Sequence, residues 1–356
     1  MANEKKAHVI AYYLPQYHPI PENDEWWGKG FTEWTNVAKA KPMFRGHYQP
    51  IVPADLGFYD LRVPEVREEQ ARLAQEAGID AFCYWHYWFG NGKQLLERPL
   101  NEVVASGKPD FPFCIGWANH SWMKKSWNNQ VSRFCQDLLI EQEYPGKEDM
   151  IAHFETLLPA FRDKRYYRID GKLLFVIFSP TTMPDTELFM STWQELAKKN
   201  NLPPFYFIGQ GDLNQIKDPV YKQYDAINVE SIRTFFNSSR LRRIIAYTLR
   251  HPITQPYKAI LKKYDMDLLK REEVIPTLYA NWDNTSRIGY IGTVFTNPDP
   301  KIFKQHIQQI IQNTGREDKL MFLKSWNEWG EGNYVEPCLK YGHGYLQALK
   351  ESIYGE

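Results

Sequence analysis

Eight short runs of apolar and aromatic residues recur along the chain, each with the length of a β-strand. Because the runs are apolar throughout, they are typical of strands that are buried on both faces, as in a parallel sheet covered by helices. The expected strands are residues 9–13, 79–85, 111–117, 173–178, 205–209, 226–229, 274–279 and 320–325.

Helical patterns lie between most of these runs. The clearest covers residues 64–78, where Pro64 stands at the first turn, acidic residues follow, and Gly78 closes the segment directly before the next strand. Residues 148–161, 185–199, 300–313 and 344–354 repeat the pattern. This alternation predicts an α/β fold, a single (β/α)8 TIM barrel with long loops at the carboxyl ends of its strands.

An open, doubly wound sheet is the alternative fold. That fold normally carries a glycine-rich phosphate-binding turn after an early strand, and none follows Tyr13 or Trp85. We therefore expect one catalytic domain over residues 1–356. Two long excursions interrupt the alternation: a loop at 14–61, rich in Pro, Trp and Gly, and a basic, helical insert at 237–271.

In a (β/α)8 barrel the functional side chains stand at the carboxyl ends of the strands and in the loops that follow them. Polar and aromatic residues recur at nearly every such position in this chain, including Tyr87, His120 and Trp122. The expected substrate-binding residues are Tyr12, Tyr13, His18, Trp85, His86, Trp88, Trp117, Asn119, Trp282, Asp283, Trp326, Asn327 and Trp329.

Glu328 and Glu331 are the candidate catalytic residues. Hydrolysis of a glycosidic bond needs one carboxyl group to protonate the departing oxygen and a second to help form the new bond at the anomeric carbon. The alternative is an Asn-Glu-Trp turn that is acidic by chance. Because a spacing of three places side chains on opposite faces of a regular strand, the backbone should leave strand geometry near Trp329 and Gly330.

Charge and composition narrow the class of ligand. Lys plus Arg and Asp plus Glu number 43 each, so no net field favours nucleic acid or an anionic membrane surface. The 12 Trp, 22 Tyr and 20 Phe residues exceed what one core should need, and many stand beside Asn, His, Gln or Glu. A neutral or weakly charged ligand such as an oligosaccharide or polysaccharide fits this composition best.

The sequence predicts neither a membrane span nor a metal site. No run approaches the roughly 20 apolar residues of a span, and the N-terminus lacks the apolar stretch of a signal peptide, so we expect a cytoplasmic protein, although a trimmed chain would look the same. No His-x-x-x-His or clustered Asp motif is present, and we expect no metal and no cofactor. Cys83, Cys114, Cys135 and Cys338 form no Cys-x-x-Cys pair, which favours buried free thiols.

Several polar residues admit two interpretations. His18, His86 and His120 are either core histidines bonded to backbone carbonyls or substrate contacts. Glu33 is a loop anchor or a third acid of the site. Asp283 either binds sugar hydroxyls or pairs with Arg287 across a turn.

Four segments carry a resemblance to a known family. Residues 14–37, 47–50, 282–285 and 326–332 read LPQYHPIPENDEWWGKGFTEWTNV, HYQP, WDNT and WNEWGEG. They resemble the WbsX family, which is found in bacterial polysaccharide clusters and is often labelled glycosyltransferase. That family is similar to glycoside hydrolase family 99, the endo-acting α-mannosidases, on the barrel and on two acids with the spacing of Glu328 and Glu331.

The resemblance to family 99 implies a retaining mechanism without a protein nucleophile. Glu328 would act as the base on the 2-hydroxyl of the sugar, which attacks the anomeric carbon to give a 1,2-anhydro sugar. Glu331 would protonate the leaving oxygen and later activate water, and Trp326 and Trp329 could raise the pKa of this acid. The 2-hydroxyl must lie anti to the leaving group, as in an α-manno or α-rhamno unit.

Two other functions stay open. A glycosyltransferase should carry a site for the diphosphate of a nucleotide sugar, and Asp265 and Asp267 form the only Asp-x-Asp motif, inside the basic insert. A non-catalytic glycan-binding barrel would keep an aromatic cleft, but binding alone does not require Glu328 and Glu331.

Overall fold

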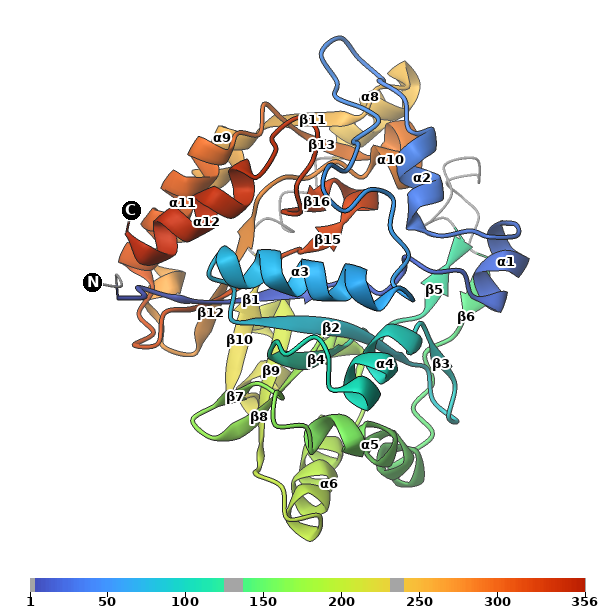
Figure 1. Ribbon diagram of the computed structural model, residues 1–356, viewed down its shortest axis with the longest axis vertical. Coiled ribbons are helices and arrows are strands. Elements are labelled where there is room, and N and C mark those ends of the chain that lie inside the picture. The colour runs from blue at the N-terminus through green and yellow to red at the C-terminus, as the bar shows by residue number, and fades with distance from the viewer. Residues whose placement is uncertain (1–3, 125–136, 231–239, 356) are drawn as a thin grey trace.

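The computed structural model describes residues 4–124, 137–230 and 240–355, and a closed sheet of parallel strands forms its centre (Figure 1). Neighbouring strands follow the order β1, β14, β12, β10, β9, β8, β4, β2, and β2 pairs with β1 to close the ring. The strands are β1 (His8–Tyr13), β2 (Ala81–Trp88), β4 (Phe113–Trp117), β8 (Lys172–Ile177), β9 (Phe205–Gly211), β10 (Ala226–Val229), β12 (Val274–Tyr279) and β14 (Leu320–Lys324). The predicted (β/α)8 barrel is confirmed, and all eight expected strands are present.

The strands are buried on both faces because their inner side chains fill the barrel and their outer side chains pack under helices. In Figure 1, α5 and α6 cover one side of the sheet, and α11 and α12 cover the opposite side. The predicted helices are found as α3 (Pro64–Glu76), α5 (Lys147–Phe161), α6 (Thr186–Lys199), α11 (Pro300–Asn313) and α12 (Gly344–Tyr354), and α4 (Arg98–Ser106) is a further one.

Gly78 shows why the first predicted helix ends where the sequence indicates. Its φ of +85° lies in the left-handed region, which favours glycine. A Cβ at this position would also meet Cε2 of Tyr354 at 3.0 Å, so the residue lets α3 pack closely against α12.

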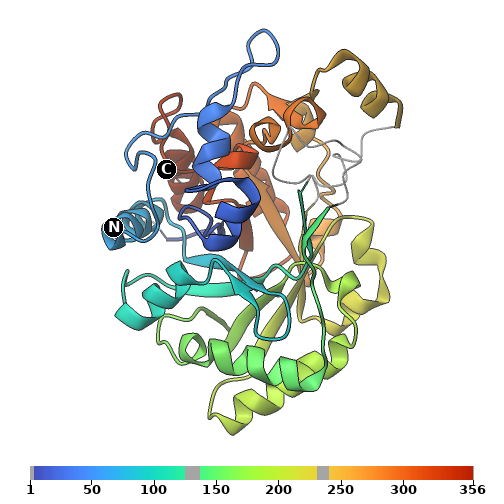
Figure 2. The same ribbon diagram turned by 90° about the vertical axis from the view of Figure 1, so that its right-hand side faces the viewer.

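Residues 14–61 fold over the carboxyl ends of the strands, where α1 (Pro21–Trp27) and α2 (Glu33–Lys39) face the viewer in Figure 2. The short strands at this end are β3 (Gln94–Leu95), β5 (Trp122–Met123), β6 (Leu138–Ile140), β15 (Asn327–Glu328) and β16 (Asn333–Tyr334). At the opposite end, β7 (Arg168–Ile169) pairs with the first residues of β8. The single-turn helices are α10 (Thr285–Ile288), η2 (Pro180–Thr182), η3 (Gln215–Lys217), η4 (Pro219–Gln223), η5 (Leu268–Lys270), η6 (Gly289–Ile291) and η7 (Trp329–Glu331).

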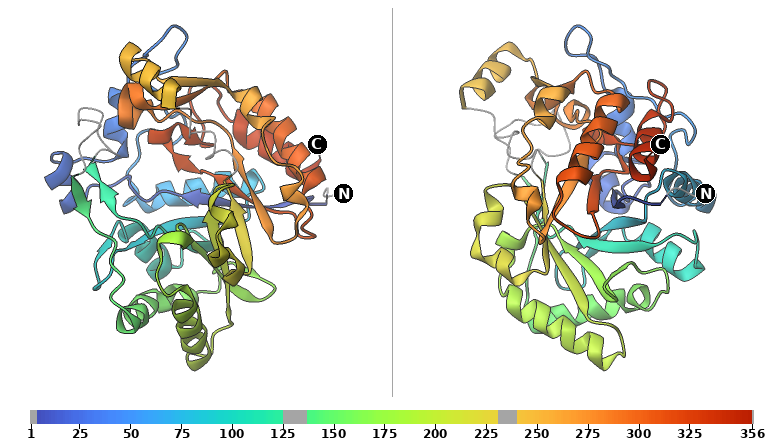
Figure 3. Two further views of the ribbon diagram at one scale, coloured as in Figure 1. Left: turned by 180° about the vertical axis from the view of Figure 1, so that it is seen from behind. Right: turned by 90° about the vertical axis from the view of Figure 1, so that its left-hand side faces the viewer.

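The insert at 237–271 is only partly helical. Residues 237–239 lie outside the described residues, and the remainder forms α8 (Arg240–Leu249), β11 (Ile253–Pro256) and α9 (Tyr257–Leu261). Strand β11 pairs in parallel with β13 (Thr293–Thr296), an addition that stands far from α5 and α6 when the molecule is seen from behind (Figure 3). The sequence therefore predicted the helices of the insert but not its strand.

Cys83, Cys114 and Cys338 are buried free thiols, as expected, and Cys135 lies outside the described residues. Among the residues described, no helix combines the length and hydropathy needed to cross a bilayer.

Trp193 on α6 tests how far stability depends on the layer between helices and sheet. Its fully buried ring lies 4.6 Å from Phe189 and 4.8 Å from Phe175, centroid to centroid. We expect Trp193→Ala to lower the free energy of unfolding by about 3–5 kcal/mol, because it removes a large buried side chain. Leu188→Ala on the same helix, where the side chain is 39% exposed, should cost under about 1 kcal/mol. Equal costs in a denaturant titration would contradict this packing.

Candidate functional site

A cavity of about 450 Å³ lies at the carboxyl ends of the barrel strands. This volume is within the range of about 300–1,000 Å³ that small-molecule sites occupy. Aromatic, polar and charged side chains meet in it from the exits of β1, β2, β4, β8, β12 and β14. The lining residues are Leu14, Trp85, Tyr87, Ala118, His120, Ser121, Trp122, Met123, Phe178, Ser179, Arg287, Lys324, Glu328 and Glu331.

Glu328 and Glu331 line this same cavity because the chain turns sharply after β14. Glu328 ends β15, and residues Trp329–Glu331 form the 3-10 turn η7 before β16 returns antiparallel to β15. The expected departure from strand geometry near Trp329 and Gly330 is therefore confirmed. Asn327 fixes the start of the turn, since its side-chain amide exchanges hydrogen bonds of 2.7 and 3.0 Å with the backbone of Leu14.

Gly330 and Gly332 allow this turn to lie against its neighbours. A Cβ on Gly330 would stand 1.7 Å from Oε1 of Glu33 and 2.8 Å from Nε of Arg287. Gly332 has a φ of +57°, and a Cβ there would meet Asp283 at 2.8 Å. Any side chain at either position would push the turn, and the two carboxyl groups that it carries, away from the barrel.

Arg287, from α10, is buried between two carboxylates that are distant in sequence. Its Nε and one terminal nitrogen donate to Glu33 at 2.9 and 3.0 Å, and its other terminal nitrogen donates to Oε1 of Glu331 at 2.8 Å. Glu33 is fully buried, whereas the side chain of Glu331 is 22% exposed toward the cavity. The expectation that Glu33 is a loop anchor agrees with this contact, and the anchor holds one of the two acids.

Glu328 lies in a less polar setting. Burial, together with repulsion from Glu331, raises the pKa of Glu328 to about 8, while the charges of Lys324 and Arg287 oppose the rise. Its Oε2 atom is buried and receives no hydrogen bond from an N–H or O–H group of the described residues. The charge of Glu331 contributes to this upward shift, so the two carboxyl groups lie close together, and Glu328 holds its proton near neutral pH.

Lys324 supplies the second cation of the cavity. Its ammonium group donates to the buried Glu230 at 2.6 Å and stands 5.9 Å from the ring centre of Trp282. Trp282 is thereby placed beneath the cation, not on the cavity surface. Because each cation has a carboxylate partner, the cavity offers no unpaired positive charge among the described residues.

The aromatic wall comes from alternate residues of β2. Trp85 and Tyr87 point into the cavity, whereas His86 and Trp88 point outward to α5. His86 meets His153 with 3.0 Å between their Nε2 atoms, and Trp88 donates to Asp149 at 2.9 Å. The strand continues to Trp88, three residues beyond its predicted end, so the prediction that His86 and Trp88 reach the site is not supported by their placement.

Most of the other expected binding residues stabilise the fold around the cavity. Inside the barrel, Tyr12 stacks on Trp85 at 4.6 Å and donates to Asn228, while Tyr13 points outward to Gln70. Trp117 packs on Phe189, and Asn119 exchanges hydrogen bonds with the backbone of Ser179. Of the thirteen, only Trp85 lines this cavity.

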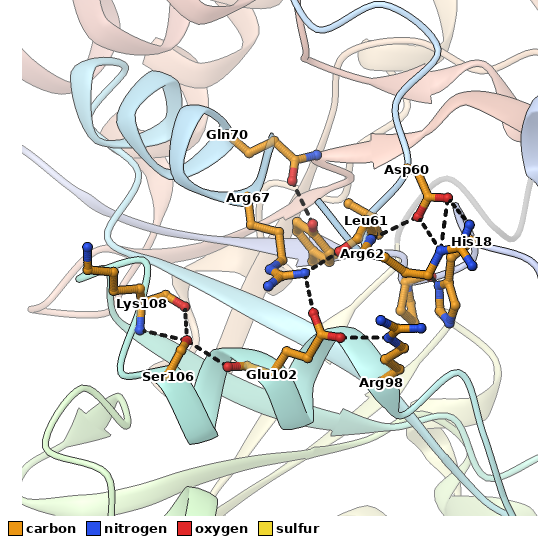
Figure 4. Close-up of polar contacts among 12 residues, drawn as sticks. His18, Asp60, Leu61, Arg62, Arg67, Gln70, Arg98, Glu102, Ser106 and Lys108 are labelled. Carbon is orange, nitrogen blue, oxygen red and sulfur yellow. Dashed lines mark hydrogen bonds and ion pairs between the residues drawn. The ribbon is translucent and has the colours of Figure 1, made fainter. Parts of the chain in front are cut away.

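His18 lies away from the cavity. Its Nδ1 contacts the carbonyl of Pro15 at 3.0 Å. Figure 4 shows it beside Asp60 and Arg62, in the group of polar contacts that joins the 14–61 loop to α3 and α4. It is a core histidine by this placement.

Trp326 and Trp329 also turn from the cavity. Trp326 packs on Phe82, and Trp329 stacks on Tyr334 at 3.9 Å and donates to Glu336 at 2.6 Å. The expectation that these two rings lie around Glu331 in the cavity is therefore not supported by their placement. The raised pKa belongs to Glu328, and its first cause is burial.

Asp283 neither lines the cavity of the acid pair nor pairs with Arg287. Its Oδ2 contacts His47 and Gln49, both at 2.7 Å, and its Oδ1 accepts from the hydroxyl of Thr285 at 2.6 Å. Within the described residues, no group of three or more His, Cys, Asp and Glu side chains has an arrangement suited to a metal ion.

Tyr87, His120 and Trp122, which the sequence placed at strand exits without assigning them to substrate, line the cavity, and so do Phe178, Arg287 and Lys324, which it did not place there. The alternation of side chains along a strand could have found Tyr87 once Trp85 was assigned to the inner face. No local signal indicates Arg287, because its partners are 254 and 44 residues away.

Comparison with known proteins supports both the motifs and the fold. Residues 9–349 match the family model described as "Glycosyltransferase WbsX". Two curated relatives, each an "Uncharacterized protein WxcX" from Xanthomonas campestris pv. campestris (strains B100 and ATCC 33913), are 32% identical over 361 residues. The match covers 98% of this chain, and the chain spans about half the length of these relatives.

Solved structures share the fold at low sequence identity. A "Glycoside hydrolase-like protein" superposes with a TM-score of 0.63 and 18% identity over 99% of this chain and 95% of the other. The family 99 endo-alpha-mannosidase from Bacteroides thetaiotaomicron gives a TM-score of 0.55 and 16% identity over 98% and 96%. Its complex with BIS-TRIS-propane gives 0.57 and 14% over 97% and 96%.

The contact between Gly330 and Glu33 can be tested by a double-mutant cycle. We expect Gly330→Ala to lower the free energy of unfolding by about 1–3 kcal/mol, because the added methyl group overlaps the Glu33 carboxylate. In a Glu33→Ala background the same change should cost clearly less, since the overlapping group is gone. Denaturant titrations of the four proteins measure both effects, and additive costs would show that the turn is limited by something other than Glu33.

Proposed function

This chain belongs to the glycosyltransferase WbsX family, whose description points to carbohydrate chemistry, and we propose that it is a single-domain retaining glycoside hydrolase. We infer a substrate of α-manno- or α-rhamno-configured polysaccharide. The observation that carries the proposal is the adjacency of Glu328 and Glu331 in one aromatic-lined cavity at the carboxyl ends of the barrel. Two neighbouring carboxyl groups supply the proton donor and the base that glycosidic cleavage requires.

The proposed mechanism uses the 2-hydroxyl of the substrate. In the first step Glu328 takes the proton of that hydroxyl, its oxygen attacks the anomeric carbon, and the glycosidic bond breaks as Glu331 protonates the leaving oxygen. A 1,2-anhydro sugar results. In the second step Glu331 takes a proton from water, the water oxygen attacks the anomeric carbon, and the ring-opened O2 regains its proton from Glu328.

Before substrate binds, the proton is on Glu328, whereas the first step requires it on Glu331. Glu328 holds it near neutral pH, because burial raises the pKa of this carboxyl group to about 8. A substrate hydroxyl that donates to Glu328 stabilises its ionised form, and a glycosidic oxygen that accepts from Glu331 stabilises its protonated form. Substrate binding would thus move the proton from Glu328 to Glu331.

Trp85, Tyr87, Trp122 and Phe178 would form the surface on which a pyranose ring stacks. Tyr87 and Trp122 meet edge to face at 5.1 Å, and Trp85 and Phe178 do so at 5.6 Å. These rigid contacts would orient a sugar above the acid pair and exclude water from the two carboxyl groups.

The family description favours a second candidate, a glycosyltransferase that uses a nucleotide sugar. The Asp-x-Asp motif gives it little support. Asp265 accepts from the backbone of Leu268, and Asp267 pairs with Lys270, so both carboxylates close exposed local turns. A non-catalytic glycan-binding barrel would not need two carboxyl groups close together in its cavity.

Single substitutions of the acids test the proposal. Purified protein is incubated with manno- and rhamno-configured glycans and aryl glycosides, with and without nucleotide sugars. We expect Glu331→Gln to slow cleavage of unactivated glycans by about 10²–10⁴-fold while sparing activated aryl glycosides, which need less protonation. Glu328→Gln should impair both kinds of substrate, because the base is needed whatever group departs.

Glu143→Gln, at an acid outside the cavity, is the matched control and should keep wild-type rates. Sugar transfer from a nucleotide sugar without hydrolysis of any glycan would move the assignment to the transferase. Full activity after removal of either acid would contradict the two-carboxyl mechanism.

The pH dependence of kcat/KM provides an independent check. The pair must hold one proton to act, and Glu328 loses that proton with a pKa of about 8. We therefore expect the rate to fall as the pH rises through about 8. In Glu328→Gln, any residual activity toward aryl glycosides should lose this alkaline limb. An unchanged limb in the variant would assign the titration to another group.

A further inference from the structure

A second cavity, of about 290 Å³, lies behind the wall that carries Glu331. Asp283 lines this cavity, and its backbone N–H donates to the carbonyl of Glu331 at 2.6 Å. The two cavities are therefore separated by a single layer of chain. The second one is lined by Phe44, Arg45, Gly46, His47, Tyr48, Ile51, Asn281, Asp283, Val294, Phe295, Thr296, Asn297, Pro298, Lys340 and Tyr341.

The polar side chains at the base of this cavity already have hydrogen-bond partners, and aromatic stacking holds them in place. His47 and Gln49 both contact Oδ2 of Asp283, and Phe44 lies flat on His47 with 4.5 Å between ring centres and 2° between planes. Because Thr285 occupies the other carboxylate oxygen, Asp283 has little capacity left to accept from a ligand. Contacts with His47, Gln49 and Thr285 compensate the negative charge of Asp283 within the cavity wall.

Two cationic side chains stand at the edge of the second cavity, and they differ from those of the first cavity in exposure and in ion pairing. Arg45 and Lys340 are exposed, and neither forms an ion pair with any residue that the structure describes. In the first cavity, by contrast, Arg287 is held by Glu33 and Lys324 by Glu230. The second cavity therefore presents unpaired positive charge, and its lining contains no acid besides the compensated Asp283.

Aromatic faces accompany these cations. The ammonium group of Lys340 stands 4.5 Å from the ring centre of Tyr48 and 4.9 Å from that of Tyr341. Both tyrosines are half-buried, and the hydroxyl of Tyr341 is fixed by a 2.8 Å hydrogen bond to the carbonyl of Pro298. A ring stacked on either tyrosine would place its substituents within reach of the cation.

We propose that this second cavity binds a pyranose that carries a carboxylate, as an acidic unit of a polysaccharide. Tyr48 and Tyr341 receive the ring, and Arg45 and Lys340 bind the carboxylate. The inference rests on the proposed function only for the view that the ligand is a unit of a glycan. It assigns the site a role in holding an acidic polymer beside the cavity that contains Glu328.

Equilibrium binding without turnover tests this site. The Glu331→Gln protein is titrated calorimetrically with a methyl glucuronide, with the matching neutral methyl glucoside and with inorganic phosphate. The acidic glycoside should bind best, and its affinity should fall as ionic strength rises. Arg45→Ala and Lys340→Ala should each weaken it about fivefold, the effect of one exposed ion pair of about 1 kcal/mol. Lys198→Ala, at an exposed lysine on α6, should change nothing.

Tyr48→Ala should weaken the acidic glycoside, whereas Tyr48→Phe, which keeps the ring, should not. Equal affinity for the neutral glycoside would overturn the proposal, as would phosphate binding of equal strength that Tyr48→Ala leaves intact. Insensitivity to Arg45→Ala and Lys340→Ala would place the ligand in the first cavity and also overturn it. Because no outcome depends on cleavage, failure here is distinguishable from failure of the proposed hydrolase.

Discussion

The buried guanidinium of Arg287 is the interaction on which the geometry of the acid pair depends. It joins Glu33 from the first long loop to Glu331 from the last strand exit, and the side chains of Glu33 and Arg287 pack against Gly330. A buried charge that loses its partner costs about 3–5 kcal/mol, so each of these residues restrains the other two. The wall formed by α10 and η7 then separates two cavities of opposite character, one with neutralised cations and one with unpaired cations.

The eight strands and five of the helices could be predicted because their signals are local. Runs without polar residues mark strands covered on both faces, and the Pro64 start and Gly78 end mark α3. Because these runs are apolar throughout, the sequence did not show which side chains point into the barrel and which point outward. In Ala81–Trp88 every position is buried, so the sequence contains no alternation that tells the inner Trp85 and Tyr87 from the outer His86 and Trp88. Contacts such as that of Arg287 with Glu33 come from barrel closure, which no local pattern encodes.

Residues that stand together in one sequence motif need not face the same cavity, and the segment at residues 326–332 illustrates why. Only its two acids face the cavity. Asn327 fixes the backbone to Leu14, and Trp329 donates to the fully buried Glu336, which also receives hydrogen bonds from Tyr59 and Gln70. Burial raises the pKa of Glu336 to about 7 despite these donors. The tryptophans that first suggest a sugar-binding surface therefore support the turn from behind.

The contact of His86 with His153 beneath α5 has a consequence for the tautomers of both rings. Two Nε2 atoms 3.0 Å apart can form a hydrogen bond only if one bears hydrogen and the other bears none. If His86 carries its hydrogen on Nε2, then His153 must carry its own on Nδ1, and the reverse assignment changes both rings together. Burial keeps both rings neutral, since it lowers the pKa of His86 to about 3 and that of His153 well below its usual value. The two imidazoles thus behave as one unit that shares two ring hydrogens among four nitrogens, so a change of tautomer in one ring requires the matching change in the other.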